Sequence, residues 1–277
     1  MLRGQRDRRD KVNEADNAAV QRKFSLEEIP ALLLVGGMGT RLRSVVSLKP
    51  KPLAPVGDIP FLELLVLQLR SQGIRRLVMC TGHQADQIKE EFGDGRKWDV
   101  SIEYSNEPQP LGTAGAVKFA ERFLSYASDF LVMNGDSLLE LDFRKFMQFH
   151  LEHGGWASIA VRKVPDAARY GTVQVDALNR VVRFSEKIGM SEPGVVNGGV
   201  YLFKQAILQR IPEGAASLEK DVLPGILEHG EFAFEQHGMF IDIGTPEDYA
   251  RAQALYLSLS QAALSHSRTG HREHLDH

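Results

Sequence analysis

Glycines and basic residues are concentrated in one short stretch near the start of the chain. Residues 32–42 read LLLVGGMGTRL, and a lysine between two prolines follows at Lys51. An apolar run of this kind is typical of a buried parallel strand. Glycines directly after a strand let the backbone approach a ligand closely, with N–H groups free to face anionic oxygens. Because Arg41 and Lys51 add fixed positive charge beside those amides, the stretch indicates a polyphosphate site in preference to a plain glycine-rich turn.

Two known phosphate-binding loops do not fit this stretch. The pattern G-x-x-x-x-G-K-[ST] of a P-loop does not occur in the sequence. Gly37 and Gly39 match the first two glycines of a dinucleotide fingerprint, but Leu42 stands in place of the third. Three prolines within residues 50–55 also interrupt the crossover helix that would lead to a ribose contact at Asp58. Nicotinamide binding is therefore disfavoured.

Two aspartates follow apolar runs elsewhere in the chain. Asp136 ends the segment MNGD, and Asp242 lies within the segment FIDIG. In open parallel sheets, ligands bind beyond the carboxyl ends of the strands. Two carboxylates from separate strands can share one hard divalent ion and leave its other positions to water and phosphate oxygens. Each aspartate alone is equally typical of a helix N-cap or a turn.

The elements that must position these residues alternate between strand and helix from Ala31 onward, which predicts a parallel sheet covered on both faces. The expected strands are Ala31–Val35, Arg76–Cys80, Val100–Tyr104, Phe130–Asn134, Ala157–Arg162 and Gly199–Phe203, with a hairpin of Thr172–Val175 and Val181–Phe184. The expected helices are Phe61–Gln72, Gln84–Phe92, Gly115–Leu124, Phe143–His153, one near Ser217–His229, and a last one capped by Thr245.

The composition is that of a globular domain. The chain has 277 residues, 43% of them apolar, and a formal net charge of -3, so nothing argues for a nucleic-acid partner. No apolar stretch is long enough to span a membrane, and the N-terminus lacks the apolar core of a signal peptide. Cys80 is the only cysteine, which excludes an internal disulfide and suits the cytoplasm.

The ends of the chain differ from its middle. We expect residues 1–28 to form a mobile N-terminal extension, residues 29–262 one catalytic domain, and residues 263–277 a disordered tail. The expected helix at Phe61–Leu69 is apolar nearly all round, which indicates burial either in the core or in a contact between copies of a homo-oligomer.

The order of these motifs resembles the sugar-phosphate nucleotidyltransferases, from G-G-x-G-T-R-L and P-K-P-L onward through about Tyr256. The resemblance implies a Rossmann-like, three-layer α/β/α fold of the nucleotide-diphospho-sugar transferase type, with a mixed, mostly parallel sheet. It also implies an enzyme that joins a nucleoside triphosphate to a sugar 1-phosphate and releases pyrophosphate. No protein nucleophile is needed, because the attacking phosphate is already anionic.

The resemblance also assigns roles to individual residues. The catalytic residues would be Arg41, Lys51 and Asp136, and Asp136 with Asp242 would bind Mg²⁺. The nucleotide would contact Gly36, Gly37, Gly39, Thr40, Gly112 and Thr113, with His83, Gln84 and the segment 111–114 as candidates for the edge of the base. The sugar phosphate would contact Gly171, Glu186, Lys187, Asn197 and Gly199.

The substrates are suggested by a shorter match. Many relatives that use hexose phosphates have P-L-T after the arginine, whereas residues 43–47 here read RSVVS. Together with the segments KPLAPV and PFLE, this region is more similar to bacterial D-glycero-D-manno-heptose 1-phosphate guanylyltransferases. We therefore expect GTP and D-glycero-α-D-manno-heptose 1-phosphate as substrates, and a product used for bacterial surface polysaccharide. Mannose 1-phosphate guanylyltransferase and glucose 1-phosphate thymidylyl- or uridylyltransferase activities are the alternatives.

Two further classes of protein fit the motifs less well. A metal-dependent glycosyltransferase of similar architecture would have an Asp-x-Asp motif, but the sequence reads Asp136-Ser137-Leu138. A non-catalytic protein that only binds a sugar nucleotide would be expected to lose a metal ligand or a phosphate-binding cation. This sequence keeps all four such residues, which are Arg41, Lys51, Asp136 and Asp242.

Overall fold

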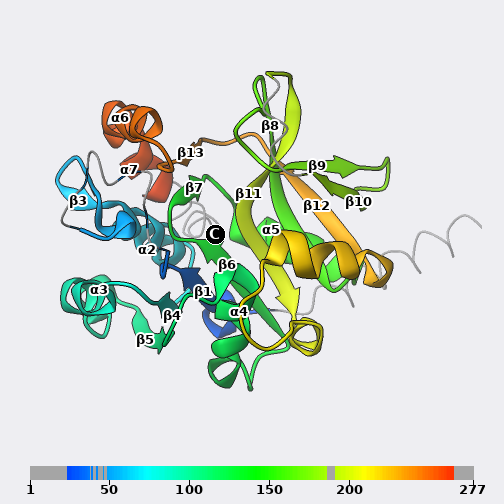
Figure 1. Ribbon diagram of the computed structural model, residues 1–277, viewed down its shortest axis with the longest axis horizontal. Coiled ribbons are helices and arrows are strands. Elements are labelled where there is room, and N and C mark those ends of the chain that lie inside the picture. Colours follow the sequence, from blue (N-terminus) through cyan, green and yellow to red (C-terminus); the bar gives the residue numbers. More distant parts are fainter. Residues whose placement is uncertain are drawn as a thin grey trace, which may run out of the picture.

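The computed structural model describes residues 24–37, 39, 42, 46, 49–185 and 191–264. Its centre is a nine-stranded sheet in the order β10-β9-β11-β6-β1-β4-β5, with β8 also beside β11 and β12 outside β8 (Figure 1). These strands are β1 (Pro30–Leu34), β4 (Arg76–Thr81), β5 (Ser101–Asn106), β6 (Asp129–Asn134), β8 (Ala157–Val164), β9 (Thr172–Val175), β10 (Val181–Ser185), β11 (Gly194–Lys204) and β12 (Glu231–Gln236).

Two short pairs of strands and six α-helices complete the described part of the chain. The short pairs are β2 (Pro55–Val56) with β3 (Ile59–Pro60), and β7 (Ser137–Leu139) with β13 (Phe240–Asp242). The helices are α2 (Phe61–Ser71), α3 (Ala85–Phe92), α4 (Gly112–Phe119), α5 (Phe143–His153), α6 (Pro246–Ala254) and α7 (Tyr256–Leu264).

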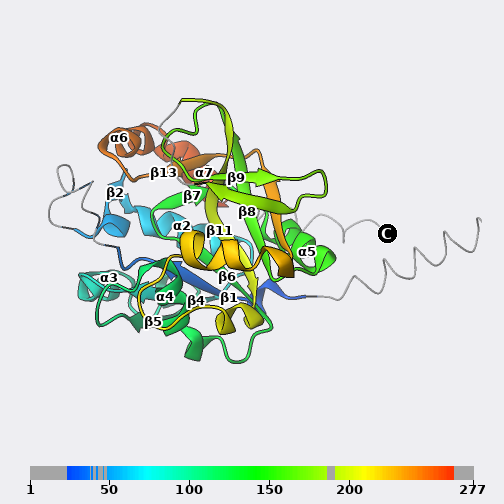
Figure 2. The same ribbon diagram turned by 45° about the vertical axis from the view of Figure 1, so that its right-hand side comes forward.

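The strand directions confirm the predicted mixed, mostly parallel sheet. β1 pairs in parallel with β4 and β6, β4 with β5, and β8 with β12. β11 runs antiparallel to β6, β8 and β9, and β10 runs antiparallel to β9. Only β10 and β11 therefore run against the other strands of this sheet. Both views show β4 and β5 on one side of β1 and β6, and β8, β11 and β12 on the other (Figures 1 and 2).

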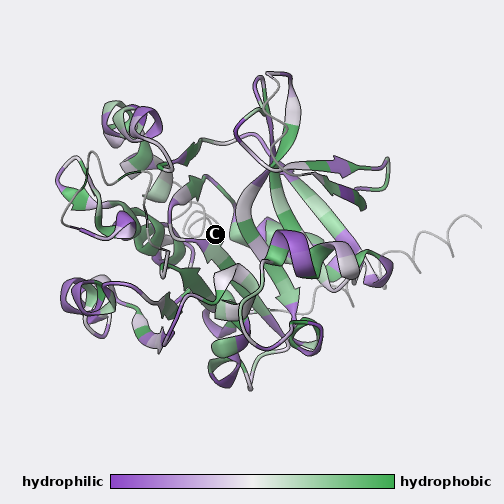
Figure 3. Ribbon diagram, in the orientation of Figure 1, coloured by the Kyte–Doolittle hydropathy of each residue, from purple (hydrophilic) through white to green (hydrophobic). Residues whose placement is uncertain are grey.

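The core is divided into two layers because successive side chains of a strand point to opposite faces. Leu33 of β1 packs with residues of α2 and α5 on one face, whereas Leu32 packs with residues of α4 and of the segment 207–226 on the other. Both leucines are fully buried. The middle residues of the central strands are accordingly apolar (Figure 3), as expected for strands covered on both sides.

Two expected elements differ from the structure. The helix expected at 115–124 begins earlier, at Gly112, and ends at Phe119, followed by a separate 3₁₀ turn. The helix expected near 217–229 is wrong: this segment consists of one π-helical turn, Leu218–Val222, and two 3₁₀ turns. Pro224 lies in the middle of the segment and cannot continue a helix, because it lacks an N–H donor.

The packed domain extends slightly beyond the boundaries expected from the sequence. Leu26, within the expected N-terminal extension, is 5% exposed and packs in the core. α7 continues to Leu264, and Ala263 is fully buried, so the expected boundary at residue 262 falls within this helix. Residues 1–23 and 265–277 lie outside the described part of the chain.

Burial accounts for two features noted in the sequence. The apolar helix α2 is covered within this chain, since Phe61, Leu62, Leu64, Leu65, Val66 and Leu69 are all fully buried. Cys80 is likewise fully buried, and burial raises the pKa of its thiol far above the ordinary value, as expected for a structural cysteine. Over the residues that the structure describes, no helix combines the length and apolarity needed to cross a bilayer.

Candidate active site

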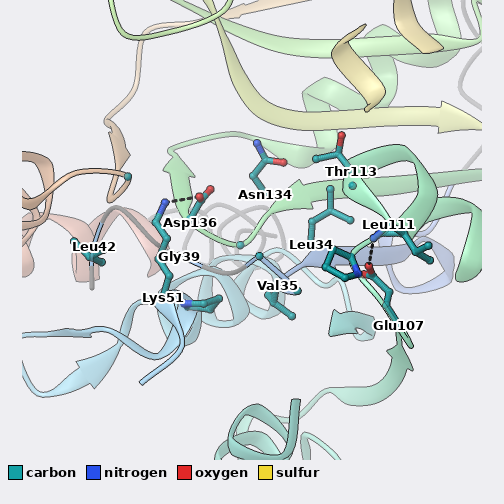
Figure 4. Close-up of a pocket in the computed structure, with 18 residues that line it drawn as sticks. Leu34, Val35, Gly39, Leu42, Lys51, Glu107, Leu111, Thr113, Asn134 and Asp136 are labelled. Atoms are coloured by element: carbon teal, nitrogen blue, oxygen red, sulfur yellow. Dashed lines mark hydrogen bonds and ion pairs between the residues drawn. The ribbon is translucent and has the colours of Figure 1, made fainter. Parts of the chain in front are cut away.

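A pocket of about 400 Å³ lies beyond the carboxyl ends of β1 and β6. Its wall is formed by residues 34–37 and Gly39 at the end of β1, by residues 110–113 at the start of α4, and by residues 134–136 at the end of β6, with Lys51 and Glu107 also facing it (Figure 4). We refer to it as the first pocket. The sequence predicts a phosphate site at this same edge of the sheet.

The glycines after β1 permit close contacts around this pocket. A Cβ atom added to Gly36 would lie 3.1 Å from Glu107 Oε1 and 3.2 Å from the backbone nitrogen of Gly82. Gly39 has a left-handed φ of +58°, and a Cβ there would lie 3.0 Å from that of Lys51. A Cβ atom added to Gly37 would have no neighbour within 4 Å, so no close contact requires a glycine there. Thr40 and Arg41 lie outside the described residues.

The two predicted aspartates converge on one lysine. Lys51 Nζ lies 2.5 Å from Asp136 Oδ2 and 3.8 Å from Asp242 Oδ1 (Figure 4 shows the shorter contact). The convergence depends on the pairing of β7 with β13, which sets Asp242 opposite Ser137. The Ile243 N–H also donates to the Asp136 carbonyl oxygen over 2.9 Å. Two segments more than one hundred residues apart in the sequence are thus held side by side.

The electrostatics of this group suit a cation. Burial and the neighbouring Asp136 charge raise the pKa of Asp242 to about 6, while the Lys51 ammonium opposes the increase. The Lys51 side chain is only 9% exposed, whereas the two carboxylates keep about a third of their surface. No group of three or more His, Cys, Asp or Glu side chains converges anywhere in the described ranges. A hard metal ion at Asp136 and Asp242 would therefore take its remaining oxygen ligands from substrate and water.

A second pocket of about 520 Å³ adjoins the first and shares Asn134 with it. We refer to it as the second pocket. Gly171 and Asn197, both predicted to contact sugar phosphate, lie in its wall, as does Asp242. Glu186 and Lys187, also predicted there, lie outside the described residues.

A bulge in β11 aims Asn197 into the second pocket. The pairing with β8 shifts register between Asn197 and Val200, so Gly198 and Gly199 are extra residues in this strand. Gly199 has a left-handed φ of +72°, and a Cβ there would lie 2.8 Å from Asn134 Nδ2. Gly199 therefore makes room for Asn134 and does not itself line the pocket. Gly112 and Thr113, which the resemblance assigns to the nucleotide, line the first pocket.

Sequence reasoning missed Glu107, which lines the first pocket, and offered His83 and Gln84 as candidates for the edge of the base. His83 is exposed, and neither His83 nor Gln84 lines the first pocket. Glu107 lines it directly after β5, and its Oε2 accepts the Leu111 N–H over 3.2 Å (Figure 4). Burial raises the pKa of the Glu107 carboxyl group, whereas that hydrogen bond lowers it. Its position at the carboxyl end of a strand was a signal that could have found it.

Comparisons with known proteins agree with this geometry. The sequence matches the nucleotidyl transferase family over residues 30–258. A D-glycero-alpha-D-manno-heptose 1-phosphate guanylyltransferase of Aneurinibacillus thermoaerophilus is 40% identical over 225 residues, which are 80% of this chain and 96% of that protein. The mannose-1-phosphate guanylyltransferase catalytic subunit beta of Drosophila melanogaster is 35% identical over 82% of this chain, which spans only 63% of that protein.

A solved structure has the same fold. HddC from Yersinia pseudotuberculosis, determined in complex with GMP-PN, superposes with a TM-score of 0.75 and 35% sequence identity over 82% of this chain and 99% of that one. The family match covers most of the chain, and the relatives described here are 35% to 40% identical to it. This chain belongs to the nucleotidyl transferase family.

Proposed function

We propose that the protein transfers GMP from GTP to a sugar 1-phosphate, with D-glycero-α-D-manno-heptose 1-phosphate as the preferred acceptor, and releases pyrophosphate. The observation that carries this proposal is the position of Lys51, Asp136 and Asp242 at the boundary between two adjoining pockets. Such a boundary is where a nucleotide α-phosphate in the first pocket would meet a sugar phosphate in the second. The product would be a cytoplasmic GDP-heptose that donates heptose to surface polysaccharide.

The reaction requires positioning and charge neutralisation more than covalent help from the protein. A sugar phosphate oxygen bonds to the α-phosphorus as the bond from that phosphorus to the bridging oxygen breaks, and pyrophosphate leaves with the electron pair. Lys51 supplies positive charge at this point, and the backbone after β1, which lines the first pocket, would face the triphosphate. Asp136 and Asp242 would hold Mg²⁺, which when bound neutralises charge on the phosphate oxygens.

Glu107 supports guanine as the base. A guanine edge presents two adjacent donors, N1–H and N2–H, and an ionised carboxylate can accept both. Uracil and thymine present a single N–H between two carbonyl oxygens, which a carboxylate would repel. Glu107 faces the first pocket, and within the described part of the chain its carboxylate accepts one hydrogen bond, from the Leu111 N–H, so it retains the capacity to accept from a base. The names of the relatives described above point to the same nucleotide.

Replacing Glu107 tests this assignment. We expect Glu107→Gln to lower kcat/KM for GTP by roughly 10- to 100-fold, because a charge-assisted pair is lost. The value for UTP or dTTP should not fall, since a glutamine can pair with an N–H and a neighbouring carbonyl. Glu103→Gln on the exposed part of the same strand is the matched control. An unchanged preference for GTP in the Glu107 variant would refute the assignment.

A further inference from the structure

Glu219 lies between the two pockets and accepts hydrogen bonds from both sides. Its Oε2 accepts from the Thr113 hydroxyl over 3.1 Å and from the Ser217 hydroxyl over 3.0 Å. Its Oε1 accepts from the Tyr201 hydroxyl over 2.8 Å. Thr113 lines the first pocket, whereas Glu219 lines the second. One carboxylate is therefore bonded to side chains that belong to two different binding sites.

The carboxylate gives this chain of hydrogen bonds a fixed direction, because an ionised carboxylate only accepts. Tyr201 must donate its hydroxyl proton to Glu219, so its oxygen accepts from Asn197 Nδ2 over 2.7 Å. The Asn197 Oδ1 then accepts the Gly199 N–H over 2.9 Å. Both ends of the Asn197 amide are thereby oriented, which leaves one N–H and one lone pair to face a ligand in the second pocket.

Thr113, at the other end of this series of hydrogen bonds, is also fixed by its partners. Thr113 donates to Glu219 and accepts the Leu218 N–H over 2.8 Å. The first turn of α4 packs directly on the segment before Glu219, since the Ala114 N–H donates to the Ala216 carbonyl oxygen over 2.9 Å. A Cβ atom added to Gly112 would lie 2.5 Å from that same oxygen. Any adjustment of this turn on nucleotide binding is consequently transmitted to Glu219.

Tyr201 completes the connection through the core. Its side chain is fully buried and stacks on Phe203, with 5.5 Å between ring centroids. Hydrogen bonds in such a buried, low-dielectric setting polarise one another, and an orphaned member is costly. The link from Thr113 to Asn197 is therefore expected to respond as a unit.

We propose that Glu219 is a positioning residue that orients the Asn197 amide for the sugar phosphate and couples the second pocket to the first through Thr113. The proposal rests on the proposed function and adds to it a defined energetic link between the two substrates. Occupation of the first pocket should raise affinity in the second, and by linkage the reverse should also hold.

The coupling is measurable without turnover. Titration calorimetry with Mg²⁺ would compare the Kd of D-glycero-α-D-manno-heptose 1-phosphate with and without a GTP analogue that has carbon in place of the α,β-bridging oxygen. We expect wild-type Kd to fall by about 10-fold when the analogue is present. Tyr201→Phe removes only the linking hydroxyl and should bring this ratio close to one. Glu219→Gln should do the same, because an amide no longer fixes the direction of the chain.

A matched variant separates coupling from a general loss of structure. Tyr249→Phe removes another hydroxyl from a buried tyrosine, one that donates to the Pro55 carbonyl oxygen away from Glu219, and should leave the ratio as in wild type. The sugar phosphate KM should rise about 10-fold in the Tyr201 and Glu219 variants, with the analogue Kd within twofold of wild type. A wild-type ratio of one, or an unchanged ratio in both variants, would overturn the coupling while turnover persists. Failure of the wild type to release pyrophosphate with any sugar 1-phosphate would instead overturn the proposed function.

Discussion

Lys51 is the residue on which the two predicted carboxylates depend. Two carboxylates this close repel one another, and the raised pKa of Asp242 records that repulsion together with burial. The Lys51 ammonium, within 4 Å of both, offsets part of it. Lys51 thus reduces the repulsion between Asp136 and Asp242 without a second cation, and both carboxylates keep oxygen atoms at the boundary of the pockets. This is the arrangement expected of a site that accepts a metal ion with its substrate.

Removing one carboxylate charge tests that interpretation. We expect Asp136→Asn to lower kcat at least ~100-fold, because a main electrostatic contribution to the transition state is lost while the side-chain volume is kept. Asp58→Asn, on an exposed turn, is the control and should leave the rate unchanged. The measurement is the initial rate of pyrophosphate release across a Mg²⁺ titration. Near-normal turnover of the Asp136 variant would argue against a metal at this position.

At the scale of single residues, the sequence identified groups that stand at the ends of strands. Asp136 could be assigned because it follows an apolar strand, whereas the roles of Gly112 and Asn197 come only from the resemblance to the nucleotidyltransferases. Glu219 could not be assigned, because its role arises from contacts with segments distant in the sequence. The partner of Glu219 is Thr113, 106 positions away. No local pattern encodes such a separation.

At the scale of elements, β12 is an unexpected strand that contains a buried carboxyl group without a hydrogen-bond partner among the described residues. Glu231, its first residue, pairs with Ala157 at the start of β8 and is 1% exposed. Neither carboxylate oxygen of Glu231 has a hydrogen-bond partner among the described residues. Burial raises the pKa of Glu231 well above the ordinary 4.5. The folded state therefore retains a proton that the unfolded chain releases.

This difference predicts how stability changes with pH. Above about pH 4.5 the unfolded state binds fewer protons than the folded state, so the free energy of unfolding falls as pH rises, by at most about 1.4 kcal/mol per pH unit. Glu231→Gln removes the titrating group and should raise Tm by several degrees at pH 8, with little change at pH 5. Glu235→Gln, exposed on the same strand, should show no such difference. Identical melting curves for wild type and the Glu231 variant at pH 8 would contradict this account.

The element pattern also shows where sequence periodicity succeeds and fails. β1, β4 and β6 were predictable because continuous apolar runs are required of strands covered on both faces. The segment 218–229 follows a helical pattern of apolar residues, yet Pro224 breaks it into short turns. Glu219 lies in the first of these turns, between the two pockets.

At the scale of the whole molecule, the first and second pockets lie at one edge of the sheet, and a different group of polar residues lies at the other. Asp129, His150 and Ser158 are hydrogen-bonded in a row, with His150 Nδ1 2.8 Å from Ser158 Oγ and Nε2 3.2 Å from Asp129 Oδ1. These are the residue types of a hydrolytic triad, but Asp129 and Ser158 lie at the amino ends of β6 and β8, away from both pockets. Ser158 and His150 are fully buried. The row joins α5 to the sheet and has no access to substrate.

The position of both pockets at the opposite edge follows from the topology. Parallel strands bring their carboxyl ends together, and β11 and the β7–β13 pair add the residues that separate one pocket from the other. The general fold and its binding edge were therefore predictable from alternating strand and helix patterns. The boundary between the pockets was not, since it depends on the pairing of two three-residue strands from distant parts of the chain.

The most direct test of the account is a matrix of substrates. Initial rates of pyrophosphate release would be measured with Mg²⁺ for ATP, CTP, GTP, UTP and dTTP, each with D-glycero-α-D-manno-heptose, mannose and glucose 1-phosphates. We expect the highest kcat/KM for GTP with the heptose phosphate, because Glu107 is proposed to accept from the two donors of guanine and the chain is similar to an enzyme named for that pair. A preference for UTP or dTTP with glucose 1-phosphate would contradict it.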